Sequence, residues 1–184
     1  MKILCFGDSN TYGYDPRSWF GETYATTWVE AMAEKLGCTV INAGENGREI
    51  SRSEHSLNLL LERHQPVDLL IVMLGTNDLL HGNAPEAVAA RMKRFLENIQ
   101  FEKSKILILA PPPMKLGEWV SSQSLLDASR RLPALYQGLG VRCAGGWEIP
   151  LAFDGVHFTE EGHAAFADHL YRYLKTEVDH ESCQ

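Results

Sequence analysis

The chain has 184 residues, 45% of them hydrophobic, and a formal net charge of −7 at pH 7. That length suits one ordinary domain with a continuous core, expected over residues 1–178 and followed by a polar tail at 179–184. The negative charge argues against nucleic-acid binding, which needs clustered Lys and Arg, and no run of about 20 apolar residues could span a membrane.

Five short apolar runs predict buried strands, because they are continuous rather than alternating. In chain order they are Ile3–Phe6, Thr39–Asn42, Leu69–Leu74, Ile106–Ala110 and Gly140–Cys143. Between them, apolar residues at helical spacing predict helices. These helices cover Tyr24–Leu36, Ser53–His64, a stretch that opens at Pro85, part of Ser121–Leu139, and Glu160–Val178.

Three residues set expectations for the helix ends. Pro85 suits a first helical turn, Pro133 is expected to end or kink its helix, and Thr159 is a candidate N-cap. The alternation of strands and helices predicts an α/β fold, a three-layer α/β/α sandwich with a parallel sheet. Functional residues should then follow the carboxyl ends of strands.

A serine lies where such a fold would place a catalytic group. Gly7-Asp8-Ser9 comes directly after the first predicted strand. A serine hydroxyl needs a base, and the base needs a third group that orients it. Near the other end of the chain, Asp154-Gly155-Val156-His157 offers both on one tight turn. Each residue alone is typical of ordinary loops, but together they predict Ser9 as nucleophile, His157 as base and Asp154 as orienting group.

Two further predicted strand ends carry hydrogen-bond donors. Asn77 follows the third strand and could donate its side-chain amide to an oxyanion. The second strand ends in small residues whose backbone N–H groups could do the same. Gly47 is the favoured donor there and Gly44 the alternative, with a plain tight turn as the competing interpretation for both.

These blocks, in this order and each at a strand end, resemble the SGNH hydrolases, also called the GDSL esterase and lipase family. The resemblance covers nearly the whole chain, and Phe-Gly-Asp-Ser-Asn-Thr-Tyr-Gly and Asp-Gly-Val-His-Phe-Thr are most similar to its small bacterial arylesterase and acyltransferase branch. It implies a flavodoxin-like, five-stranded parallel sheet. It also implies a triad of Ser9, Asp154 and His157 and an oxyanion hole of Ser9, Gly47 and Asn77.

Several residues beside these blocks are candidates for a substrate pocket. Asn10, Pro111, Phe153 and Val156 are the preferred set, because they adjoin the predicted site. Trp119 and Trp147 could line an acyl pocket as well, although large aromatic residues are more often simply packed.

The expected activity is that of a serine esterase acting on small or short-chain acetyl or aryl esters through an acyl-enzyme. Alternatives with the same triad are a thioesterase, a lysophospholipase and a carbohydrate acetylesterase. The lack of a long insertion that could form a lid favours short acyl groups. A nucleotide- or flavin-binding module is the competing class, but the chain has no glycine-rich phosphate motif.

Metals, cofactors and disulfides are not expected. Cys5, Cys38, Cys143 and Cys183 are widely separated and form no C-x-x-C pair, which favours reduced thiols. His163 and His169 follow His157 at six-residue intervals. On a helix, six residues turn the chain by about 600°, which places the rings on different faces, so surface histidines rather than metal ligands are expected. The expected partner is a small-molecule ester, the resemblance allows a homo-oligomer, and a cytoplasmic location follows because no secretory leader is recognised.

Overall fold

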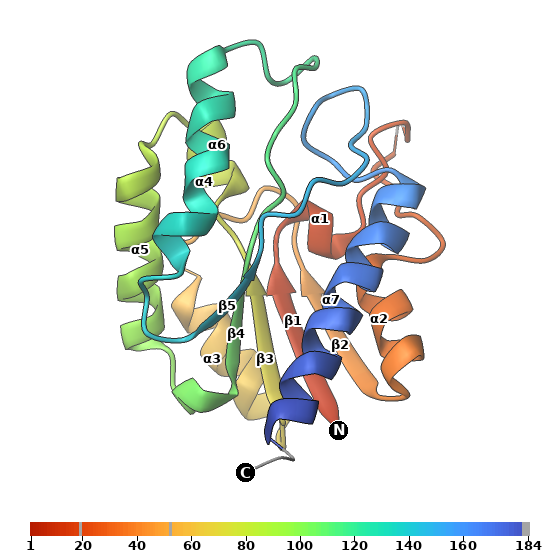
Figure 1. Ribbon diagram of the computed structural model, residues 1–184, viewed down its shortest axis with the longest axis vertical. Helices are drawn as coiled ribbons and strands as arrows, with labels where there is room; N and C mark the ends of the chain where they lie inside the picture. The colour runs from red at the N-terminus through yellow and green to blue at the C-terminus, as the bar shows by residue number, and fades with distance from the viewer. Residues whose placement is uncertain (19, 52, 182–184) are drawn as a thin grey trace.

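The computed structural model describes residues 1–18, 20–51 and 53–181, and a parallel sheet of five strands lies at its centre (Figure 1). The strands are β1 (Lys2–Gly7), β2 (Thr39–Gly44), β3 (Leu69–Met73), β4 (Ile106–Ala110) and β5 (Arg142–Gly145). Their order is β2-β1-β3-β4-β5. The α/β sandwich and all five strands are therefore confirmed, with β5 beginning two residues later than Gly140.

Helices cover both faces of the sheet (Figure 1). On one face are α2 (Trp28–Leu36) and α7 (Glu160–Glu181), and on the other are α3 (Glu54–Arg63), α5 (Pro85–Asn98) and α6 (Gln123–Tyr136). Two short helices, α1 (Ser9–Tyr12) and α4 (Thr76–Leu80), follow β1 and β3, and a 3-10 turn spans Lys103–Lys105. These three short elements were not predicted.

Successive strand residues point to opposite faces, so the sheet separates two apolar clusters. In β1, Leu4 and Phe6 pack on the α3–α5–α6 side, whereas Ile3 and Cys5 pack on the α2–α7 side. The helices cover both faces of the sheet so fully that β3 and β4 are buried along their whole length. This continuous burial explains why their sequences are apolar runs without alternation.

Several helix ends differ from the sequence-based expectation, and α2 begins at Trp28 rather than at Tyr24. The helix α6 continues past Pro133 to Tyr136. Tyr136 anchors this last turn, because its ring is fully buried and its hydroxyl donates to the Leu74 carbonyl. The helix α7 continues past Val178 to Glu181. Residues 182–184 of the predicted tail, with Cys183, lie outside the described residues. The N-cap prediction is confirmed, because Thr159 Oγ1 accepts from the Gly162 N–H at 3.0 Å.

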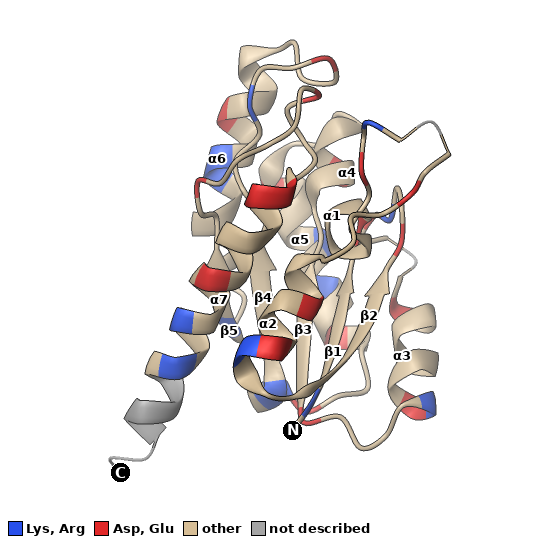
Figure 2. Ribbon diagram, turned by 90° about the vertical axis from the view of Figure 1, so that its right-hand side faces the viewer, with Lys and Arg blue, Asp and Glu red and all other residues tan. Residues whose placement is uncertain are grey.

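Acidic and basic residues both occur along α2, α3 and α7 (Figure 2). One ion pair, Lys35 to Asp168 at 2.9 Å, links α2 to α7. Among the helices that the structure describes, none is both long enough and apolar enough to cross a bilayer.

Candidate active site

The nucleophile candidate lies where the sheet order reverses. The chain leaves β1 toward β2 on one side and returns to β3 on the other, and Ser9 follows β1 at this switch point, the usual ligand position in such folds. Asp8 is the N-cap of α1 and accepts from the Asn10 N–H at 3.0 Å. Gly7 is required before this turn, because a Cβ there would lie 2.8 Å from the Met73 carbonyl oxygen.

Ser9, His157 and Asp154 form one continuous hydrogen-bonded chain. Ser9 Oγ lies 2.9 Å from His157 Nε2, and His157 Nδ1 lies 2.6 Å from Asp154 Oδ2. Because a carboxylate can only accept, Nδ1 carries the proton and Nε2 is free to accept from the serine hydroxyl. All three side chains are buried. The structure thus brings together the three residues predicted as a triad.

The turn after Asp154 holds this carboxylate in place. Its Oδ1 accepts from the backbone N–H groups of Val156 and His157, each at 2.9 Å. Burial acts to raise the pKa of Asp154, but these bonds and the His157 ring outweigh it and hold the pKa below its ordinary value. Gly155 has φ of 80°, and a Cβ there would lie 2.1 Å from the Lys115 carbonyl oxygen. The tight turn expected at Gly155 is therefore present.

Asn10 does not line a pocket, in contrast to the expectation. Its side chain is 3% exposed. The amide Nδ2 donates to the Val156 carbonyl at 3.1 Å, and Oδ1 accepts from the Phe158 N–H at 3.0 Å. The Asn10 side chain therefore fastens the backbone on either side of His157 to the turn that carries Ser9. A contact between a side chain and such a distant backbone segment is not visible in sequence spacing.

The two oxyanion-donor candidates lie on neighbouring segments. Asn77 Nδ2 donates to the Arg48 carbonyl at 3.0 Å, so α4 is tied to the segment after β2. The Arg48 guanidinium donates to the Gly7 carbonyl at 2.8 Å and lies over the Phe6 ring at 4.0 Å from its centroid. This arginine fixes the segment next to Gly47, and its role was not predicted.

Geometry distinguishes Gly47 from Gly44. The Gly44 N–H donates to Asn42 Oδ1 at 3.0 Å, so it is already used. A Cβ at Gly44 would lie 2.0 Å from the Tyr12 backbone nitrogen, which explains the glycine by close packing. Gly47 is exposed, has φ of 74°, and has nothing within 4 Å of where a Cβ would be.

The buried carboxylate of Asp78 joins the segment after β2 to α5. Asp78 is fully buried, and its Oδ2 accepts from the Ile50 N–H at 3.0 Å. Its Oδ1 accepts from Arg91 at 2.8 Å, and Arg91 also donates to Asn83 Oδ1 at 2.7 Å. Asp78 therefore supports the loop backbone after β2.

Two aromatic rings contact the His157 imidazole. The centroids of Tyr14 and Trp119 lie 4.8 Å and 5.0 Å from that of His157, both in edge-to-face arrangements. Tyr14 gives no signal in the sequence, because the loop that carries it folds back through a bridge to Thr23. For Trp119, the sequence leaves open a wall of an acyl pocket or a simply packed ring.

His163 was expected at the surface, but the structure buries it. It is 1% exposed, and its Nδ1 accepts from the Trp28 N–H at 3.1 Å. Burial lowers the pKa of His163 to about 4, so the ring is neutral near pH 7. Within the part of the chain that the structure describes, no group of three His, Cys, Asp or Glu side chains could hold a metal ion.

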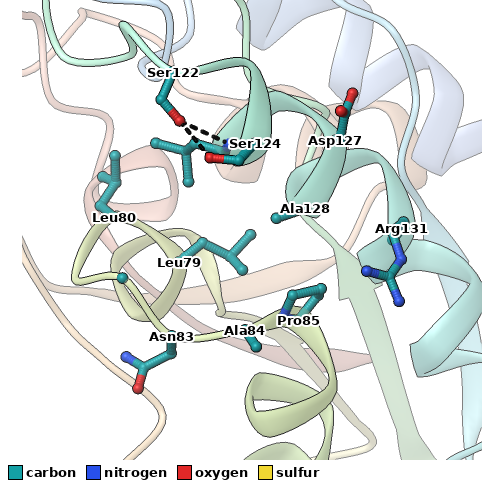
Figure 3. Close-up of a pocket in the computed structure, with 12 residues that line it drawn as sticks. Leu79, Leu80, Asn83, Ala84, Pro85, Ser122, Ser124, Asp127, Ala128 and Arg131 are labelled. Atoms are coloured by element: carbon teal, nitrogen blue, oxygen red, sulfur yellow. Dashed lines mark hydrogen bonds between the residues drawn. The ribbon is translucent and has the colours of Figure 1, made fainter.

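The remaining pocket candidates lie in different surroundings. Pro111 and Val156 are buried, Val156 within the apolar core, whereas Phe153 is 53% exposed. A separate groove of about 620 Å³ lies between the α4–α5 connection and α6 (Figure 3). Its lining includes Leu80 and Leu125 but none of the predicted site residues.

Residues 5–165 match the model of the GDSL-like lipase/acylhydrolase family. The chain belongs to this family, which confirms the resemblance drawn from its four sequence blocks. The parallel sheet, the helix-covered faces and the serine at the switch point are thus those of an SGNH-type hydrolase.

Individual relatives carry several activity names. The chain is 23% identical to thioesterase 1/protease 1/lysophospholipase L1 of Escherichia coli K12, over 98% of this chain and 86% of that protein. It is 28% identical to an arylesterase of Vibrio mimicus, over 59% of this chain and 53% of that protein. Among solved structures, it is similar to the aryl esterase of M. smegmatis (TM-score 0.82) and to the carbohydrate acetylesterase Est24 of Sinorhizobium meliloti (TM-score 0.81). Each is 25% identical, with 95% of this chain and 98% of the other aligned.

Proposed function

We propose that the chain is a carboxylic ester hydrolase that passes the acyl group of a small or short-chain ester first to Ser9 and then to water. The observation that carries this proposal is the hydrogen-bonded chain from Ser9 through His157 to Asp154, at 2.9 and 2.6 Å. A buried serine has no structural need for a histidine whose other nitrogen is held by a carboxylate, whereas a nucleophile does.

The reaction proceeds in two halves. In the first, Ser9 Oγ attacks the ester carbonyl while His157 Nε2 takes its proton, and the imidazolium is stabilised by Asp154. His157 then gives this proton to the oxygen of the leaving alcohol as the carbonyl–oxygen bond breaks. In the second half, water attacks the acyl-Ser9 ester with His157 as base, and the acid leaves as Ser9 recovers its proton.

The oxyanion is stabilised by the Ser9 N–H, the Gly47 N–H and the Asn77 amide in this proposal. An amide nitrogen carries two protons, and only one of those on Asn77 is used by the Arg48 carbonyl. The Ser9 N–H is the first of α1 and therefore has no acceptor within that helix. Removal of one such donor typically costs about 100- to 1000-fold in turnover.

The segments around the site favour short acyl groups. Residues 111–122 and 146–159, both fully described, connect strands to helices at the carboxyl end of the sheet and contain no helix. A deep lipid pocket would need a larger covering insertion.

The decisive test combines chemical labelling with one substitution. We expect a fluorophosphonate probe to label the wild-type protein at Ser9 and Ser9→Ala to remain unlabelled. Hydrolysis of p-nitrophenyl acetate should fall at least about 10⁴-fold in Ser9→Ala, since only binding and the oxyanion donors remain.

The control is Ser104→Ala, which removes an exposed hydroxyl at the opposite end of β4. It should leave labelling and hydrolysis unchanged. If Ser9→Ala kept wild-type hydrolysis, the nucleophile would be another group and the proposal would be wrong.

A further inference from the structure

Three large apolar side chains remain exposed beside the turn from Asp154 to His157, here called the catalytic loop. Leu116 is 68% exposed, and Trp119 and Phe153 are each 53% exposed. They lie on two segments that pair through their backbones: the Glu118 N–H donates to the Phe153 carbonyl at 3.2 Å, and the Trp119 N–H to the Asp154 carbonyl at 3.1 Å. An exposed apolar group at a reaction centre points to a contact with a ligand or partner.

The segment that carries Trp119 is fixed against the catalytic loop. The Lys115 N–H donates to the Gly155 carbonyl at 3.0 Å, and Gly117 closes a turn with Val120, which is fully buried. A Cβ at Gly117 would lie 2.4 Å from the Asp154 carbonyl carbon. This close approach holds the indole in one place relative to the base.

The indole lies directly against the catalytic base. Its centroid is 5.0 Å from that of the His157 ring, at an interplanar angle of 81°. His157 is only 2% exposed, whereas about half of Trp119 is open to solvent. A free apolar surface is therefore available next to the His157 ring.

The mechanism defines which part of the substrate reaches this surface. His157 must donate to the oxygen of the leaving alcohol, so that oxygen lies within hydrogen-bond reach of Nε2. The carbonyl oxygen is directed instead toward the donors at Gly47 and Asn77. The first carbons of the alcohol then lie beside His157, where Trp119 is the exposed neighbour.

We propose that Trp119 is a specificity-determining residue that binds the alcohol portion of the ester and favours apolar, ring-bearing alcohols. The inference rests on the proposed function and concerns the leaving group, not the acyl group. An aromatic ring packs well on an indole through stacked or edge-to-face contacts, and Phe153 lies on the paired segment as a second apolar contact. This role differs from the acyl-pocket wall expected from the sequence.

The test compares two acetate esters that differ only in the alcohol. Benzyl acetate and methyl acetate release alcohols of similar acidity and form the same acetyl-enzyme, so their difference in kcat/KM reports how the alcohol is bound during acylation. We expect the wild-type protein to prefer benzyl acetate. Trp119→Ala should lower kcat/KM for benzyl acetate about tenfold, and that for methyl acetate less than about twofold.

Two variants serve as controls. Trp119→Phe should keep most of the preference, because a ring remains. Leu59→Ala removes a side chain of similar exposure, 52%, from α3, and it should change neither ester.

The outcomes separate this inference from the proposed function. If the wild-type protein is labelled at Ser9 and hydrolyses methyl acetate, but Trp119→Ala lowers both esters equally, Trp119 has only a structural role and the inference fails alone. A change in oligomeric state of Trp119→Ala by light scattering would make the ring a contact between copies and would also overturn it. Absence of both labelling and hydrolysis in the wild-type protein would contradict the proposed function itself.

Discussion

Asp8, directly before Ser9, is a buried carboxyl group with a raised affinity for its proton. Burial raises its pKa from 3.8 to about 6, although the Asn10 N–H and the nearby His157 and Arg48 act to lower it. The folded state therefore binds the Asp8 proton more tightly than the unfolded state does. Between pH about 4 and about 6, the contribution of Asp8 to stability falls as the pH rises, because its protonation is favoured only in the folded chain.

Asp8→Asn removes this titration while keeping a side-chain oxygen that can accept from the Asn10 N–H. Relative to wild type, the free energy of unfolding of Asp8→Asn should improve by up to about 3 kcal/mol between pH 4 and pH 7.5. Urea unfolding at the two pH values measures this difference.

The control for Asp8 is Asp168→Asn, which alters an exposed carboxylate whose pKa is lowered by Lys35. Its difference from wild type should change in the opposite direction and by less. A pH-independent difference for Asp8→Asn would show that Asp8 keeps an ordinary pKa in the folded chain.

At the residue scale, sequence reasoning reached those groups whose chemistry depends on local spacing. Asp154 and His157 share one turn, so their contact is a local property. The contacts of Asn10 and Trp119 depend instead on how segments far apart in the chain are brought together by the fold. No residue pattern within either segment records such pairing.

Among the elements, α4 and α5 are joined to the segment after β2 by the Asp78 carboxylate. This carboxylate accepts from Arg91 and from the Ile50 N–H. Because Asn77 is the neighbour of Asp78 on α4, the same contact sets the distance between the two segments that carry the proposed oxyanion donors. The loss of Arg91 would leave a buried charge poorly compensated.

We therefore expect Arg91→Met to destabilise the fold by about 2 kcal/mol, below the usual range for a buried pair since the arginine is partly exposed. Its kcat should fall more than its KM changes, because the donors act on the transition state. Urea unfolding and steady-state kinetics measure the two effects.

Lys35→Met is the matched comparison for Arg91→Met, since it breaks an exposed ion pair to Asp168. It should cost less than about 1 kcal/mol and leave kcat unchanged. Equal effects of the two variants would show that Asp78 needs no cation.

The longer elements were predictable because burial leaves a periodic signal. The strands β1, β3 and β4 are continuous apolar runs, and α5 carries a clear stripe that starts at Pro85. The helices α1 and α4 are four and five residues long and too short for periodicity. At Pro133 the packing of Tyr136 outweighs the local preference of proline to end a helix.

In the molecule as a whole, segments from the first and the last parts of the chain meet at the site. The bond between Ser9 and His157 joins residues 148 positions apart. Beside it, the Trp28 indole N–H donates to the Asn10 carbonyl at 3.0 Å, and the Trp28 backbone N–H donates to His163 at 3.1 Å. The helices α2 and α7 therefore meet the turn after β1 next to Ser9.

This convergence predicts that the active site does not open separately from the rest of the fold. In a urea titration, loss of ester hydrolysis and loss of far-ultraviolet circular dichroism should superimpose, as for a single cooperative unit. Asn10→Ala removes both bonds between Asn10 and the His157 segment, each worth about 1–3 kcal/mol when a buried partner is left unpaired. In this variant hydrolysis should be lost at a lower urea concentration than circular dichroism. If the wild-type protein already loses hydrolysis first, the catalytic loop opens locally and the contacts of Asn10 and Trp28 do not couple it to the core.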